Sequence, residues 1–200
     1  MFPRRFPLLV ASMLLIATPA LAQLNGSDQH KFLDAIKNQK GQDVTDMLAK
    51  PGNSLVNTQD PSSGETALDI VVRRGDATYT RFLLQHGADP NIRNRQGDTA
   101  TMIAVTENEE PCLQILLAGK ANANIANDRG ETPLIRAVQL RNIAMVQDLL
   151  GAGADPDQTD HIAGLSARDY AKRDTRSTVI AKMLADAPRV RKAPSVGPSL

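Results

Sequence analysis

The chain has few of the cysteines that crosslink a protein and few of the aromatic residues that fill a large core. Of its 200 residues one is cysteine, none is tryptophan, and aromatic residues make up 3%. A single cysteine excludes an intrachain disulfide framework. Because aromatic side chains supply much of the area buried in a large core, their scarcity favours a core of small aliphatic residues in thin layers. The formal net charge of +1 gives no general attraction to nucleic acid.

Sequence motifs of catalytic sites and metal sites are also lacking. Three histidines are spread along the chain without a His-x-x-x-His pair, so zinc has no ligand spacing to use. Neither a Gly-x-Ser-x-Gly motif nor a phosphate-binding glycine loop occurs. Asp155, Asp157 and Asp160 resemble a calcium loop only in part, because its glycine and closing glutamate are replaced. We therefore expect no catalytic residue, no metal ion and no cofactor.

Residues 1–22 are predicted to be a cleaved export signal. Two arginines near the N-terminus supply positive charge, an apolar run covers residues 8–17, and residues 20–22 read Ala-Leu-Ala. The apolar run is much shorter than the roughly 20 residues of a membrane-spanning helix. We predict cleavage before Gln23, which makes the mature chain periplasmic or secreted, with no membrane insertion. The arginine pair leaves the general and twin-arginine export routes both open.

Two landmarks recur along the rest of the chain with one period. A Gly-x-Thr/Ser-Ala/Pro pattern opens at four glycines spaced 33, 33 and 34 residues apart, which are Gly64, Gly97, Gly130 and Gly164. A Gly-Ala-Asp pattern keeps the same register at residues 87–89 and 153–155. Self-similarity at this period predicts a stack of short units in place of one central core.

Each unit is predicted to consist of two short helices and a hairpin-like loop. A hydroxyl residue two positions after each landmark glycine is well placed as a helix N-cap, at Thr66, Thr99, Thr132 and Ser166. Gly87 and Gly153 suit helix ends that need a positive φ. Cys112 lies among aliphatic residues of a second helix, so we predict a buried, unreactive thiol.

The period, the Thr-Pro-Leu start at residues 132–134 and the Gly-Ala-Asp ending resemble the ankyrin repeat. The resemblance implies an all-α solenoid of about five helix-pair units joined by hairpin-like loops. It covers roughly residues 27–187, within a predicted repeat domain at 23–187 that is divided into a cap at 27–52 and repeats at about 60–92, 93–125, 126–159 and 160–186. The tail at 188–200 holds three prolines and three positive charges and is predicted to be disordered.

Some positions depart from the family pattern. Ankyrin repeats usually have a histidine after Thr-Pro-Leu, whereas this chain has Asp69, Met102, Ile135 and Asp169. Arg168 stands where the other units have a leucine or threonine, which fits a terminal repeat whose outer face meets water. We expect these changes to weaken the hydrogen bonds between repeats and to lower stability, without altering the architecture.

The resemblance implies a non-catalytic protein-binding module. Ankyrin repeats usually hold their partners with the hairpin tips and inner-helix ends of the concave face. Carried onto this sequence one residue at a time, those positions predict a mixed-charge surface with arginine anchors for carboxylates. They are Glu65, Arg73, Arg74, Arg95, Gln96, Asp98, Thr106, Glu107, Asp128, Arg129, Glu131, Gln139 and Leu140.

The expected partner is another protein, bound by a monomeric chain in the bacterial envelope. A narrower role is also open, as an accessory or inhibitor protein of one exported enzyme, because the resemblance extends to periplasmic ankyrin proteins linked to catalase and stress protection. A third alternative is an enzyme, such as a hydrolase acting on the envelope. That alternative requires titratable residues that converge in a closed pocket.

Overall fold

The computed structural model describes residues 26–50 and 55–188. The predicted export signal, and all of the predicted tail except Pro188, lie outside the described residues. The described chain forms a short 3-10 helix at Leu55–Asn57 and ten α-helices. The α-helices are α1 (Gly26–Lys37), α2 (Gly41–Leu48), α3 (Ala67–Arg73), α4 (Ala77–Gln85), α5 (Ala100–Thr106), α6 (Glu110–Ala118), α7 (Pro133–Gln139), α8 (Ile143–Gly151), α9 (Ala167–Arg173) and α10 (Thr178–Asp186).

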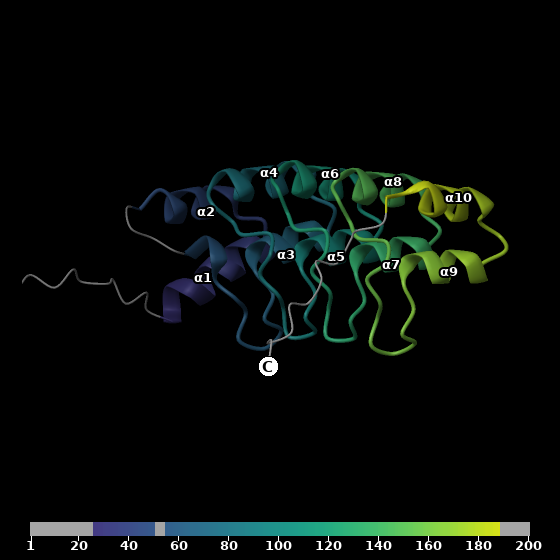
Figure 1. Ribbon diagram of the computed structural model, residues 1–200. Coiled ribbons are helices and arrows are strands. Elements are labelled where there is room, and N and C mark those ends of the chain that lie inside the picture. Colours follow the sequence, from purple (N-terminus) through teal and green to yellow (C-terminus); the bar gives the residue numbers. More distant parts are fainter. Residues whose placement is uncertain (1–25, 51–54, 189–200) are drawn as a thin grey trace, which may run out of the picture.

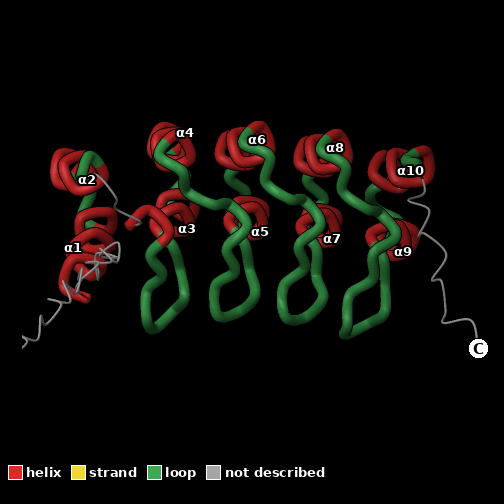
Figure 2. Tube along the Cα trace, turned by 60° about the vertical axis from the view of Figure 1, so that its left-hand side comes forward, coloured by secondary structure: helices red, strands yellow, loops and turns green. Residues whose placement is uncertain are grey.

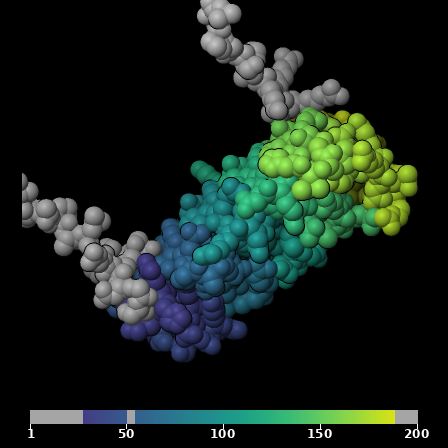
Figure 3. Space-filling model, turned by 90° about the horizontal axis from the view of Figure 1, so that it is seen from below, coloured from purple at the N-terminus to yellow at the C-terminus, as the bar shows by residue number. Residues whose placement is uncertain are grey.

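The helices lie in two rows along an elongated stack. Figure 1 shows an inner row of odd-numbered helices and an outer row of even-numbered helices. The loops that join successive units extend from the inner row to one side, as the arches of Figure 2 show. The units follow one another in sequence order from one end to the other (Figure 3). The predicted all-α solenoid of five helix pairs is therefore confirmed.

The inner helices begin where the sequence predicts. Each of the four predicted hydroxyl caps accepts a hydrogen bond from the backbone N–H three residues further on, at 3.2 to 3.4 Å. Such a cap satisfies one of the amide groups that a helix start leaves unpaired. At the other helix ends, Gly87 and Gly153 both have a φ of 86°. The local sequence thus determines where the helices begin and end in each repeat.

The core consists of thin aliphatic layers between neighbouring units. Its largest fully buried side chains include one aromatic residue, Phe32, while the others are leucine, isoleucine and methionine. Tyr79, Phe82 and Tyr170 pack against this core but are only partly buried. Burying one leucine or isoleucine side chain contributes about 1.5–3 kcal/mol, so many small layers can replace a large aromatic core.

Backbone hydrogen bonds join each hairpin loop to the next. The N–H groups of Arg95, Asp128 and His161 each donate to a carbonyl in the preceding loop, at 2.8 to 3.1 Å. Each accepting carbonyl belongs to the residue just before a landmark glycine. These bonds require the loops to approach closely, which ties the conformation of each loop to its neighbour.

Asparagine side chains join the units at the ends of the outer helices. The Asn57 side chain accepts from the N–H of Asp89 at 2.8 Å and donates to the carbonyl of Gly87 at 3.2 Å. Asn124 makes the equivalent pair of bonds to the next unit, at 2.6 and 3.0 Å. The chain thus has hydrogen bonds between repeats although it lacks the family's usual histidines.

Arg168 closes the C-terminal end of the stack. The sequence predicts a solvated face at this position, but the residue is 8% exposed. Its Nε donates to Asp157 at 2.8 Å, and an Nη group donates to the carbonyls of Ala187 and Pro188 at 2.8 and 3.2 Å. Asp157 occupies the position that asparagines hold in earlier units. In the described part of the chain, Arg168 therefore bonds to the residue whose counterparts in earlier units contact the next repeat.

We expect Arg168→Met to lower the free energy of unfolding by about 2 kcal/mol, because it removes charge-assisted hydrogen bonds from a buried position. Urea denaturation followed by circular dichroism measures the change. Lys172→Met on the same helix is the matched control, since the Lys172 side chain is 73% exposed. Equal losses in the two variants would contradict the assigned role of Arg168.

Candidate protein-binding surface

The hairpin loops and the C-terminal ends of the inner helices form one continuous side of the stack, visible as the arches and the middle row of Figure 2. We call this side the inner surface. The predicted partner-binding residues fall on both of its parts. Those in the loops are Glu65, Arg95, Gln96, Asp98, Asp128, Arg129 and Glu131. Those at or just after a helix end are Arg73, Arg74, Thr106, Glu107, Gln139 and Leu140.

Three of the predicted residues come together in one ion-pair network. The Arg73 guanidinium lies 2.5 Å from a carboxylate oxygen of Glu65 and 2.7 Å from one of Glu107. Glu65 belongs to the loop before Arg73, whereas Glu107 belongs to the next unit. Arg73 therefore ties two repeats together, and its donors are largely used within the chain.

Other predicted arginines also make contacts within the stack. Arg74 donates to the carbonyl of Ile36 in α1 at 2.8 Å and pairs with Asp76 at 3.1 Å, which joins the first helix pair to the second. Arg95 donates to the carbonyl of Pro61 in the preceding loop. An arginine at these positions is thus a structural contact as well as a candidate anchor.

The predicted acidic residues differ in accessibility. Asp128 is exposed and pairs at 2.7 Å with Arg93, a loop residue that sequence analysis did not select. Glu131 is only 7% exposed and lies between Arg129 and Arg136, at 3.1 and 4.0 Å. Asp128 and Glu131 are therefore already paired with arginines, whereas Asp98 accepts a hydrogen bond from the Asn127 side-chain amide at 3.0 Å.

Several predicted positions remain open on the inner surface. Thr106, Gln139 and Leu140 are exposed at helix ends, and Leu140 keeps 42% of its surface accessible. Thr106 and Gln139 occupy the same position in successive repeats. In the last repeat that position is Arg173, which is missing from the residues predicted from the sequence. The repeat spacing, which is 34 residues in the last unit, could have found Arg173.

The position that usually holds histidine contains a buried carboxyl group at Asp69. Asp69 is 1% exposed and accepts from the backbone N–H and hydroxyl of Thr66 at 2.8 and 3.0 Å. Burial raises its pKa to about 6, and the hydrogen bonds from Thr66 offset only part of that effect. Asp169 occupies the same position in the last repeat, but its hydrogen bonds from Ser166 hold its pKa below the usual value.

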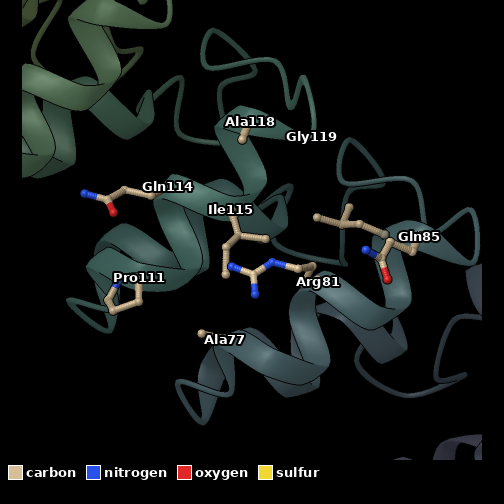
Figure 4. A pocket seen from close by; sticks show the side chains of 9 residues that line it. Ala77, Arg81, Gln85, Pro111, Gln114, Ile115, Ala118 and Gly119 are labelled. Atoms are coloured by element: carbon tan, nitrogen blue, oxygen red, sulfur yellow. The ribbon is translucent and has the colours of Figure 1, made fainter.

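A hollow of about 630 Å³ lies on the opposite side of the stack, between the outer helices α4 and α6. Figure 4 shows Ile115 and Pro111 on one wall and Arg81 crossing from the other. Arg81 is the one titratable residue among those that line this hollow. The hollow therefore offers no converging pair of titratable groups for acid–base chemistry.

Comparison with known proteins decides the family. The family model described as "Ankyrin repeats (3 copies)" matches residues 32–126 and 83–160, which together cover more than half of the chain. The chain belongs to the ankyrin-repeat family. It is also similar to a curated protein, the oxysterol-binding protein homolog 1 of Saccharomyces cerevisiae, with 35% identity over 69 residues. That match covers 33% of this chain and 6% of the yeast protein, so the chain spans only a small part of that relative.

Membership has a direct functional meaning, because ankyrin repeats are protein–protein interaction modules and the family is generally non-catalytic. Within the described ranges, no group of three or more His, Cys, Asp or Glu residues could hold a metal ion. None of the helices described by the structure is long and apolar enough to cross a membrane.

Cys112 is buried in the second helix of its repeat, as predicted, and is 0% exposed. Burial raises the pKa of its thiol, and a hydrogen bond from the Thr80 hydroxyl offsets only part of that rise. We expect the native ankyrin domain to react with a disulfide reagent such as Ellman's reagent about 100-fold more slowly than the unfolded chain, because reaction requires opening of the fold. Equal rates with and without denaturant would contradict this packing.

Proposed function

We propose that the chain is a non-catalytic protein-binding module of the bacterial envelope and that it holds its partner on the inner surface. The observation that carries this proposal is a contrast between two parts of each repeat. The hydrogen bonds that shape the repeats are the same from unit to unit, whereas the side chains exposed on the inner surface differ. The caps and loop-to-loop hydrogen bonds repeat from unit to unit, but the residue at one exposed helix-end position changes through Arg73, Thr106, Gln139 and Arg173. Such variation on a constant scaffold suits specific recognition.

The binding part of this proposal is tested by capture from a periplasmic extract of the source bacterium. We expect the tagged chain to retain one specific protein, identified by mass spectrometry, and Thr106→Arg with Leu140→Arg to abolish retention. Both residues are exposed and lie on the inner surface, so the substitutions should leave the fold intact. The matched control, Arg81→Glu with Gln85→Arg, changes exposed residues of α4 on the opposite side.

Retention of the protein by both double variants would refute binding through the inner surface. Loss of retention by both would mean that the contact is not confined to that side. Circular dichroism of each variant verifies that the helices remain folded.

The envelope location rests on the charged and apolar pattern of residues 1–22. Expression of the full chain in a Gram-negative host, followed by fractionation and N-terminal sequencing, tests it. We expect a periplasmic or secreted product that begins at Gln23. A cytoplasmic product that retains the leader would overturn the location.

We also propose that the mature chain is a monomer, which light scattering tests by giving the mass of one chain. The narrower role as an accessory or inhibitor of one exported enzyme stays a prediction. Identification of the captured protein would decide it.

A further inference from the structure

A groove runs along the C-terminal half of the inner surface, between the last two inner helices. Two adjoining hollows form it, with volumes of about 280 and 440 Å³. Both are lined by Gln139 of α7 and Tyr170 of α9, so they lie next to each other. The walls of this groove carry five arginines, and we call it the arginine groove. They are Arg129, Arg136, Arg141, Arg173 and Arg176.

The arginines outnumber the carboxylates that line the groove. Those carboxylates are Glu131, Asp160 and Asp174. Arg129 and Arg136 share Glu131, at 3.1 and 4.0 Å. Each of these two arginines therefore keeps donors that the single shared carboxylate does not use.

The same sharing recurs in the second hollow. Arg141 and Arg176 both pair with Asp174, at 2.5 and 3.3 Å. The Arg173 side chain, on the same wall, is exposed and makes no hydrogen bond or ion pair with any residue in the described ranges, although its charge helps to lower the pKa of Asp169. The second hollow thus holds three guanidinium groups and one carboxylate.

The third carboxylate is already fully engaged. Asp160 accepts from the Tyr170 hydroxyl at 2.6 Å and from three successive backbone N–H groups, of residues 162–164, at 2.6 to 3.1 Å. Burial opposes ionisation, but these hydrogen bonds outweigh it and leave the pKa of Asp160 below its usual value. Asp160 is therefore a fixed anion that orients Tyr170, and it does not bind any groove arginine.

The N-terminal half of the inner surface shows the opposite balance. Arg73 is held by two carboxylates, Arg93 by Asp128, and Arg95 by a backbone carbonyl. Only one of these three arginines lacks a carboxylate partner, whereas in the arginine groove four arginines share two carboxylates and Arg173 pairs with none. This asymmetry indicates the part of the surface that favours an anionic ligand.

We propose that the arginine groove binds an extended acidic segment of a partner protein, whose glutamate or aspartate side chains pair with Arg173, Arg176 and Arg129. This inference rests on the proposed function and specifies the partner's chemistry. A guanidinium presents a planar fork of donors that matches a carboxylate. Three carboxylates already line the groove, and their repulsion disfavours the dense charge of a phosphate backbone more than that of separated single carboxylates.

The test is a titration of the isotope-labelled, exported full chain, observed by NMR spectroscopy. The probe is a ten-residue peptide with five glutamates alternating with serines, and the matched control is the same peptide with glutamines. We expect saturable shifts of backbone amides around Gln139, Tyr170 and Arg173, with the glutamine peptide at least tenfold weaker. A ten-nucleotide oligothymidine tests the phosphate alternative.

Variants separate the groove from the rest of the surface. Arg173→Glu with Arg176→Glu should weaken binding of the glutamate peptide at least tenfold, whereas Arg81→Glu, an exposed arginine of the opposite side, should change it less than twofold. Both groove residues are exposed, and Arg176 makes only a surface ion pair, so the fold should survive.

Three results would overturn the proposal: no saturable shifts, equal binding of the glutamine peptide, or tighter binding of oligothymidine in the groove. If the capture experiment still depends on Thr106 and Leu140 while the glutamate peptide does not bind, the partner is held on the inner surface and only its acidic character is refuted. If capture also fails to depend on those residues, the proposed function fails with it.

Discussion

Replacing Gly97 with alanine should lower the free energy of unfolding by about 3–5 kcal/mol, because the substitution disturbs two repeats. Gly97 has a φ of 78°, a left-handed conformation that costs an L residue about 1–2 kcal/mol. A Cβ atom there would lie 2.6 Å from the backbone nitrogen of Asp128 in the next loop. That nitrogen donates to the carbonyl of Gln96, so it cannot move away without lengthening a hydrogen bond between repeats.

The chain supplies its own control for this prediction in Gly164. Gly164 has the same role in the last repeat and a φ of 64°, but a Cβ there would meet nothing within 4 Å. Gly164→Ala should therefore lower the free energy of unfolding only by the cost of the left-handed conformation, about 1–2 kcal/mol. Urea denaturation of both variants measures the difference. Equal destabilisation would show that contact between successive loops contributes little to the stack.

The second large effect concerns Asp69, whose pKa of about 6 makes stability depend on pH. Its pKa is higher in the folded chain than the usual value of 3.8, so its contribution is fully present below about pH 4 and is lost as the pH rises through 6. A shift of this size corresponds to roughly 3 kcal/mol. Asp69→Asn keeps an acceptor oxygen for Thr66 and removes the charge. We therefore expect the variant to be more stable than the parent by about 2–3 kcal/mol at pH 7.5 and no more stable at pH 4.

Asp169→Asn is the matched variant, for which we expect the opposite change in stability at pH 7.5. The pKa of Asp169 is lowered by hydrogen bonds from Ser166, so its contribution is present above the unfolded value and is lost as the pH falls. The asparagine variant should thus be less stable than the parent at pH 7.5 and should approach it in acid. Chemical denaturation at several pH values tests the pair. A loss of stability at pH 7.5 in Asp69→Asn would contradict the desolvated carboxyl group.

Much of the fold could be predicted from sequence because its determinants are local. The hydroxyl caps at Thr66 and Thr132 and the positive φ at Gly87 depend on residues within one turn or loop, and the 33-residue period repeats them. A solenoid needs little else, since each unit packs mainly against its neighbours. The sequence period therefore predicted the number of units and their order along the stack.

The chemistry of the surface was less predictable, because it depends on side chains from different repeats. The pairing of Arg73 with Glu107 joins residues in two units, and the burial of Arg168 depends on where Ala187 and Pro188 lie. Neither contact has a spacing signature in the chain. The sequence located most positions of the inner surface, but it could not tell which arginines the stack itself would use.

Site-specific photocrosslinking tests the central claim most directly, because it reports the contacting side without relying on binding energies. A photoreactive phenylalanine analogue is placed at Thr106 or Gln139 on the inner surface, and at Arg81 or Gln85 on the outer helix α4. After irradiation in periplasmic extract, we predict that Thr106 and Gln139 become joined to one and the same protein, while the positions on α4 do not. Crosslinking of that protein from Arg81 or Gln85, and not from Thr106 or Gln139, would contradict the assignment of the inner surface as the binding site.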